Sequence, residues 1–276
     1  MKKLFTAIQK NDIETARSLL DKSPDLISCV LKGTPKKFDG QSPLQVALKT
    51  SNTEMIELLL TYNPNVNFIE DESCANPWRA PVIHDAINRA IMYSRWNVNR
   101  PDGLEVFNDE KSANDAFAVL KEIIDMGADV NFIEDETCCN AWRTPVLHDA
   151  INCAVMSCRW NIDDKYMGFR EFSTKERAVE ALDVLKRMLN MGADVNALDS
   201  YGNSGLNRFA LQAKQILPSY NYAEHREGND RIFTAELHED LRSVLQALKK
   251  PVSLSLTGRY LQELSDRIHL QEDFLI

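Results

Sequence analysis

Two histidine-aspartate pairs are the first residues in this sequence whose types and spacing could do chemistry. His84 precedes Asp85, and His148 precedes Asp149. An imidazole next to a carboxylate is a common combination in general bases and in metal sites. The two pairs therefore admit a catalytic or metal-binding reading, and the residues around them must decide whether it holds.

Cysteines upstream of these histidines could in principle combine with them as the ligands of a zinc site. Cys74 comes before His84, and Cys138-Cys139 comes before His148. Neither group has the C-x-x-C spacing that holds two thiolates at tetrahedral geometry, so we expect no metal. The six cysteines also lack the pattern of a small secreted disulfide scaffold, and we expect reduced thiols.

Motifs of the common enzyme classes are missing from the sequence. It contains no glycine-rich phosphate loop, no nucleophile elbow and no H-E-x-x-H pattern. We therefore expect no cofactor and no enzymatic activity. A hydrolase that uses the two histidine-aspartate pairs is the least favoured alternative.

Charge and hydropathy restrict the kinds of partner. The chain has 276 residues, with 41 acidic against 32 basic side chains and a formal net charge of -9. An acidic surface opposes the phosphate contacts that drive nucleic-acid binding, so a charged partner should be basic. No apolar run approaches the roughly 20 residues that cross a bilayer, and the first apolar run ends too early for a signal peptide. We expect a cytoplasmic protein that does not contact a membrane.

A long internal duplication organises the middle of the chain. Residues 67–97 align without gaps on residues 131–161, at a constant offset of 64, with 22 of 31 positions identical. A third mark follows, because the sequence M-G-A-D-V-N occurs at 126–131 and again at 191–196. Such self-similarity indicates a repeat architecture.

Apolar spacing within the duplicated segments predicts helices. Apolar pairs recur every four residues over 82–91 and again over 146–155, which gives each helix one buried stripe. Further helices are indicated over 116–124 and 178–189 by the same spacing. A helix pair of this size cannot close a core alone, so neighbouring pairs must stack on one another.

These repeats resemble the ankyrin repeat, whose pattern runs D-x-x-G-x-T-P-L-H-x-A-A and later V-x-x-L-L-x-x-G-A-D-V-N. The segment D-G-Q-S-P-L at 39–44 and the segment T-P-V-L-H at 144–148 carry the first half of the pattern, and 43–67 fits the whole spacing without insertion. The resemblance implies an all-α fold, an ankyrin-type α-solenoid of stacked helix-turn-helix repeats with short β-like fingers.

The repeat spacing also gives domain boundaries. We expect repeats at about 1–38, 39–76, 77–140 and 141–203, a fifth beginning at 204, and residues 218–276 as the rest of that repeat with a C-terminal helical cap. The third and fourth repeats are enlarged, because about 26 extra residues separate their helices. The last pair should have helices near 206–217 and 233–249.

The position of the two histidines within the ankyrin repeat pattern favours a structural role over a catalytic or metal-binding one. Each lies at the T-P-L-H position, where the resemblance implies a structural group that is buried and hydrogen-bonded within its repeat. Pro81 and Pro145 precede them at the structural proline position. We therefore assign His84 and His148, with these prolines, to stability rather than to catalysis or metal binding.

Residues outside the buried stripe that recur in both copies are the candidates for partner binding. They comprise an acidic run and a Trp-Arg pair in each enlarged turn, and polar residues at helical spacing after each histidine. The residues are Glu70, Asp71, Glu72, Trp78, Arg79, Asp85, Asn88, Glu134, Asp135, Glu136, Trp142, Arg143, Asp149 and Asn152. Tryptophan and arginine are enriched among interface hot spots, although a tryptophan in an enlarged loop can also plug the ends of helices.

The function that the resemblance implies is protein-protein interaction, through the fingers and the concave helix surface, without catalysis. This rests on the fold and does not identify a ligand. The alternative is a cytosolic inhibitor or immunity-type protein that neutralises a basic enzyme with its acidic fingers. It depends on the net charge and on the doubled acidic runs.

Overall fold

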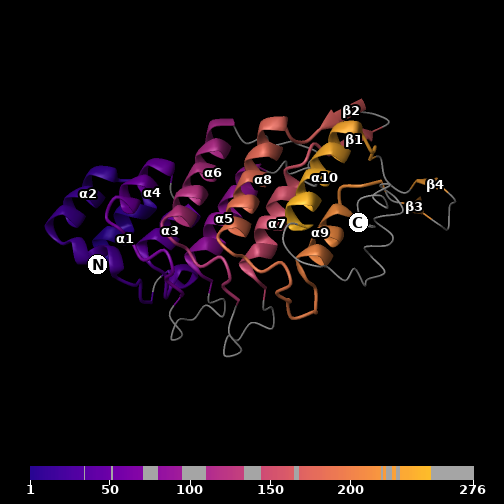
Figure 1. Cartoon of the computed structure of the whole chain (residues 1–276). Coiled ribbons are helices and arrows are strands. Elements are labelled where there is room, and N and C mark those ends of the chain that lie inside the picture. The colour runs from indigo at the N-terminus through magenta and orange to yellow at the C-terminus, as the bar shows by residue number, and fades with distance from the viewer. Residues whose placement is uncertain are drawn as a thin grey trace. The chain divides into compact units, whose positions relative to one another are not determined.

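The structure is a computed structural model that describes residues 1–33, 35–50, 52–70, 80–94, 110–133, 144–164, 168–218, 220–221, 226–227 and 231–249. These ranges contain ten α-helices and four short strands, which confirms the expected all-α class. The contacts divide the chain into two compact units, one comprising Met1–Tyr93 and Asp109–Val146 and the other Ser94–Asn108 and Leu147–Ile276. Figure 1 labels the elements of both units.

The first unit consists of six helices. They are α1 (Lys2–Gln9), α2 (Ile13–Lys22), α3 (Pro43–Thr50), α4 (Thr53–Leu60), α5 (Val82–Ser94) and α6 (Glu110–Asp125), with 3-10 turns at Pro24–Ser28 and Lys36–Phe38. Helix α1 packs on α2 and α3, and α4 contacts α2, α3 and α6. The helices α2, α4 and α6 therefore lie side by side in one row, as Figure 1 shows.

Local sequence signals fix the ends of these helices. The side chain of Asp12 accepts a hydrogen bond from the Thr15 backbone N–H and starts α2, and Asn52 caps α4 in the same way through the N–H of Met55. Asn11, at the turn between α1 and α2, has φ of 55°, a left-handed conformation that asparagine tolerates well. Tight turns of this kind let two short helices pack as an antiparallel pair.

The described residues of the second unit form four helices and two small hairpins. Its elements are α7 (Val146–Met156), β1 (Asn161–Asp164), β2 (Gly168–Glu171), α8 (Lys175–Asn190), α9 (Gly205–Ala213), β3 (Tyr220–Asn221), β4 (Arg226–Glu227) and α10 (Ala235–Lys249). Helix α10 packs against α8 and α9. The last helix pair thus begins and ends close to the expected positions.

The insertion after α7 is structured in a way that the sequence did not predict. Strand β1 pairs with β2 in antiparallel register, with Asn161 opposite Glu171 and Asp164 opposite Gly168. Gly168 has φ of 73°, which a residue without a side chain adopts at little cost. The polar composition of this insertion suggested a loop, because its alternation of apolar and polar residues is too short to distinguish a hairpin from an irregular turn.

A glycine fixes the start of the last helix pair. The N–H of Gly205 donates to the Val195 carbonyl at 2.9 Å. A Cβ atom at Gly205 would lie 3.0 Å from that carbonyl oxygen and 3.1 Å from Cδ1 of Ile151. The close approach of this backbone to its neighbours therefore requires glycine where the family pattern places proline.

Candidate functional site

The first finger of the duplicated region has a β-like base in the first unit. Ile69 forms an antiparallel bridge with Pro81, and the Val82 N–H donates to the Phe68 carbonyl at 3.2 Å. This pairing brings residues 68–70 alongside 80–82. The expectation of short β-like fingers is met at this base.

Glu70 does not lie on an exposed edge of this finger, as the sequence analysis expected. Its side chain is fully buried, and Oε1 accepts hydrogen bonds from Gln41 Nε2 at 2.6 Å and from Lys49 Nζ at 3.1 Å. The prediction that Glu70 contacts a partner is therefore wrong. A carboxylate at the base of the finger gains two charged or polar donors from the start of the same repeat, and an exposed orientation would lose these two hydrogen bonds.

Asp85 is also buried, although it too was expected on the exposed face. It is 6% exposed, and its Oδ2 lies 3.3 Å from Lys49 Nζ. The single ammonium of Lys49 thus faces two buried carboxylates, Glu70 and Asp85. Burial raises the pKa of Asp85 to about 6, against the opposing attraction of Lys49.

The exposed face of α5 carries the remaining residues predicted for the first copy. His84 and Asn88 are half-buried, and Nε2 of His84 lies 2.8 Å from the amide nitrogen of Asn88. Met92, one turn further along the same stripe, is 71% exposed. His84 is therefore hydrogen-bonded as predicted, but it is only half-buried.

The histidine of α7, in the second unit, is buried more deeply than His84. His148 is 1% exposed, and it lies against the backbone of Ala197, whose hydrogen bonding favours the charged ring. Asp149 and Asn152 are half-buried, and Asn152 Oδ1 accepts from Arg208 Nε of α9 at 2.9 Å.

A second finger, at residues 197–203, is held by a single carboxylate. Asp199 Oδ1 accepts from the N–H groups of Tyr201 and Asn203, both at 2.9 Å, and Oδ2 accepts from Asn203 Nδ2 at 3.1 Å. Gly202 closes the turn with φ of 76°. The finger presents two large side chains to solvent, Leu198 at 56% exposed and Tyr201 at 66% exposed.

Sequence reasoning missed Leu198 and Tyr201 as candidate contacts. The signal that could have found them is the D-x-x-G pattern of Asp199 and Gly202, which belongs to the family's finger. The search for candidates relied on residues shared by the two duplicated copies, and this finger lies outside the duplication.

The Arg-Trp-Asn sequence of the second copy is a structural clamp. Arg159 donates to Asp240 from Nε at 2.9 Å and from Nη2 at 2.7 Å, and Nη2 also donates to Glu239 at 2.9 Å. Trp160 is 4% exposed and stacks on Phe172 with ring centroids 4.4 Å apart. For this tryptophan the plug alternative is confirmed.

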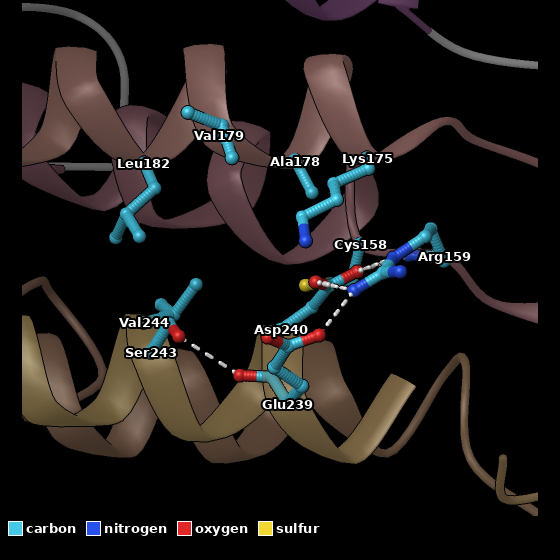
Figure 2. A pocket seen from close by; sticks show the side chains of 10 residues that line it. All are labelled: Cys158, Arg159, Lys175, Ala178, Val179, Leu182, Glu239, Asp240, Ser243 and Val244. Carbon is cyan, nitrogen blue, oxygen red and sulfur yellow. Dashed lines mark hydrogen bonds and ion pairs between the residues drawn. The ribbon is translucent and has the colours of Figure 1, made fainter. Parts of the chain in front are cut away.

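Figure 2 shows the contacts of Arg159 with Glu239 and Asp240 at one end of a groove between α8 and α10. The groove has a cavity volume of about 70 Å³, and its apolar wall includes Val179 and Leu182 of α8 and Val244 of α10. Ser243 Oγ donates to the Glu239 carbonyl at 2.9 Å, inside helix α10. The charged groups at the end of the groove pair with one another, so the groove has no concentrated charge for a ligand.

Several predicted site residues lie outside the described residues, and so does Trp96. They are Asp71, Glu72, Trp78, Arg79, Glu134, Asp135, Glu136, Trp142 and Arg143. Pro81 and Pro145 are described and buried, in line with their structural assignment.

Within the described ranges, no three histidine, cysteine, aspartate or glutamate side chains come together in a way that could hold an ion. In the same part of the chain, no helix combines the length and hydropathy needed to cross a bilayer. Cys29, Cys153 and Cys158 form no disulfide bond with another described residue.

Comparison with known proteins agrees with the helix pairs and the fingers. Residues 39–71 match the family model described as the ankyrin repeat. A search of curated proteins found none that matches the chain. The matched segment contains α3, α4 and the first flank of the finger base at 68–70. The chain therefore contains an ankyrin repeat at residues 39–71.

Proposed function

We propose that this protein binds another protein, without catalysis, through the finger at 197–203 and the exposed faces of α5 and α7. Ankyrin repeats are protein-interaction modules, and this supports the class of function. The observation that carries the assignment to a surface is the exposure of Leu198 and Tyr201 on a finger fixed by Asp199. A rigid loop loses little conformational entropy on binding, so its apolar side chains can contribute strongly to affinity.

In the second unit the exposed face of α7 extends this surface, and in the first unit the exposed face of α5 is proposed as a contact surface of its own. The proposed contacts on α5, in the first copy, are Asn88 and Met92. The proposed contacts on α7, in the second copy, are Asp149 and Asn152. Trp78, Arg79, Trp142 and Arg143 remain proposed contacts from the two enlarged fingers. Glu70 and Asp85 are removed from the proposed surface because they are buried.

Isolation of the partner and a pair of finger substitutions test the proposal. The partner is captured from a lysate of the source with the purified chain as bait and is then purified. Its Kd is measured by calorimetry for the native chain and for the Leu198→Ser/Tyr201→Ser double variant. Loss of two hot-spot side chains should raise Kd at least about 30-fold.

Val179→Ser is the matched control for this experiment. Val179 is 55% exposed on α8, which is comparable to Leu198, but it lies outside the fingers. It should leave Kd unchanged. If the double variant keeps its helical circular dichroism and binds as tightly as the native chain, the finger is not the binding surface.

A basic partner is the second part of the proposal, supported by the formal net charge of -9. Acidic residues around a binding surface accelerate association with a basic protein. An inhibitor of a basic enzyme would be one protein of this type. The burial of Glu70 removes one acid from the first run, so Asp71 and Glu72 remain as its acidic candidates.

A further inference from the structure

A buried histidine lies beneath the finger that carries the proposed contacts. His148 belongs to α7 and is 1% exposed, and it lies against the backbone of Ala197 at the start of the finger, whose hydrogen bonding favours the charged ring. A neutral imidazole tolerates this surrounding at a modest cost. A charged imidazolium does not, because burial removes the water that would solvate it.

Three charged groups from three elements face this ring. The carboxylate of Asp199 in the finger has Oδ2 4.0 Å from Nδ1, Arg208 approaches from α9, and Asp149 lies on α7 itself. Burial is the largest effect and lowers the pKa of His148 below its ordinary value of 6.5; Asp199 and Asp149 oppose this, whereas Arg208 adds to it. The ring is therefore neutral at pH 7.

The carboxylate that faces His148 also builds the finger. Asp199 accepts the two backbone hydrogen bonds from Tyr201 and Asn203 that set the turn, and its side chain is 5% exposed. The Asp199 carboxylate therefore both sets the turn of the finger and contributes to the electrostatic environment of His148. Protonation of His148 must affect the finger, and movement of the finger must affect the charge balance around His148.

We infer that mild acidification opens the 197–203 finger away from His148, so that pH controls how Leu198 and Tyr201 are presented. Opening lets water reach the imidazolium and removes the burial penalty, while α7 can stay packed in its unit. The inference rests on the proposed function, because it concerns regulation of the same finger.

The sign of the effect follows from linkage. The folded-state pKa of His148 lies below the unfolded value of 6.5, so the closed finger binds a proton less readily than the open one. The closed form has its full stability above pH 6.5 and loses it as the pH falls below that value. Each unit of pKa difference corresponds to about a tenfold change in the opening equilibrium.

Hydrogen exchange on the full chain tests the inference without a partner. The amides of Tyr201, Gly202 and Asn203 all donate hydrogen bonds within the finger. Their protection factors are measured by mass spectrometry or NMR at pH 7.5 and pH 5.5 and corrected for intrinsic exchange. We expect protection to fall about tenfold at the lower pH while α7 amides change less than about twofold.

Two variants separate the histidine from other titrating groups. His148→Gln removes the titration, and its finger protection should be the same at both pH values. His84→Gln is the matched control, since it changes the equivalent histidine of the other copy, and it should keep the native pH response. An NMR titration of the His148 ring in the native chain, with an apparent pKa below 6.5, supplies a readout if His148→Gln fails to fold.

Three results would overturn the inference: protection of the finger that does not change with pH, an equal loss in His148→Gln, or an equal loss in the α7 amides, which would mean global unfolding. Failure here leaves the binding proposal intact, because Kd at pH 7.5 does not involve opening. Conversely, an unchanged Kd for the Leu198→Ser/Tyr201→Ser variant would reject the proposed binding surface. The pH dependence of hydrogen exchange in the finger would still stand.

Discussion

At the scale of single residues, burial decides the role of charged side chains that look alike in the sequence. Asp85 and Asp149 occupy matching positions in the two copies, yet Asp85 is 6% exposed and Asp149 is half-buried. Asp85 shares the ammonium of Lys49 with Glu70. Burial and the nearby carboxylate of Glu70 both raise the pKa of Asp85, so its charged form is disfavoured at neutral pH.

The substitution Asp85→Asn should therefore stabilise the protein at pH 7.5. The folded-state pKa of about 6 lies above the ordinary 3.8, so the ionised form of Asp85 is disfavoured by up to about 3 kcal/mol in the folded chain. The gain in unfolding free energy should appear above pH 6 and vanish near pH 4, where the native Asp85 is protonated. Urea unfolding across this pH range measures it.

Asp149→Asn is the control for this prediction, because it makes the same chemical change at the matching position of α7. Its effect on unfolding free energy should not follow the pH profile of Asp85→Asn. A destabilisation of Asp85→Asn at pH 7.5 would show that the ion pair with Lys49 outweighs the cost of burying the carboxylate.

At the scale of secondary-structure elements, one arginine connects the end of α7 to α10. Arg159 contacts Asp240 through two side-chain nitrogens, and its backbone N–H donates to the same carboxylate at 2.8 Å. Asn161 adds a further link, since its Oδ1 accepts from the Ile232 N–H at 3.1 Å. The inserted segment between α7 and α8 thereby positions the last helix.

Replacement Arg159→Met should lower the unfolding free energy by about 3–5 kcal/mol, because it leaves the carboxylate of Asp240 buried without its charged partner. Thermal and urea unfolding measure the loss. The double variant Arg159→Met/Asp240→Leu should recover a large part of it, since no buried charge remains.

The exposed pair of Arg187 and Asp183, 4.0 Å apart on α8, supplies the matched control. Arg187→Met should change the unfolding free energy by less than about 1 kcal/mol. If Arg159→Met costs no more than this control, the clamp does not stabilise the position of α10.

At the scale of the whole molecule, the charge balance gives the expected signature of binding. The formal net charge of -9 favours a basic partner and an association rate that falls with salt. The variant that tests the acidic fingers should change Asp71, Glu72, Asp135 and Glu136 to their amides. Glu70 must be kept, because its removal would disturb the buried contacts of Lys49 and Gln41.

This four-site variant should associate with the captured partner more slowly than the native chain at low salt, and the difference should shrink at high salt. The Debye length falls from about 10 Å at 0.1 M to about 3 Å at 1 M, so screened charges no longer attract. Stopped-flow association rates across this range are the measurement. Equal rates for both proteins at 0.1 M would mean that these acids have no part in steering.

The sequence by itself determined the helical class, the ankyrin repeat at residues 39–71 and the approximate positions of several helices. These features depend on local patterns, namely apolar residues at helical spacing and turn residues at fixed offsets, and such patterns survive without knowledge of the neighbours. The helices expected from the apolar stripes at 82–91 and 146–155 correspond to α5 and α7. The expected last helix pair corresponds to α9 and α10.

Only the tertiary structure decided which polar residues are available to a partner. Glu70 and Asp85 carry the same charge as exposed acids, but both are buried against Lys49, which lies 21 or more residues earlier in the chain, and Gln41 also donates to Glu70. His84 and His148 have the same local sequence, yet their burial differs because different neighbours cover them. Solvent exposure depends on contacts between residues far apart in the chain, and a one-dimensional pattern does not contain those contacts.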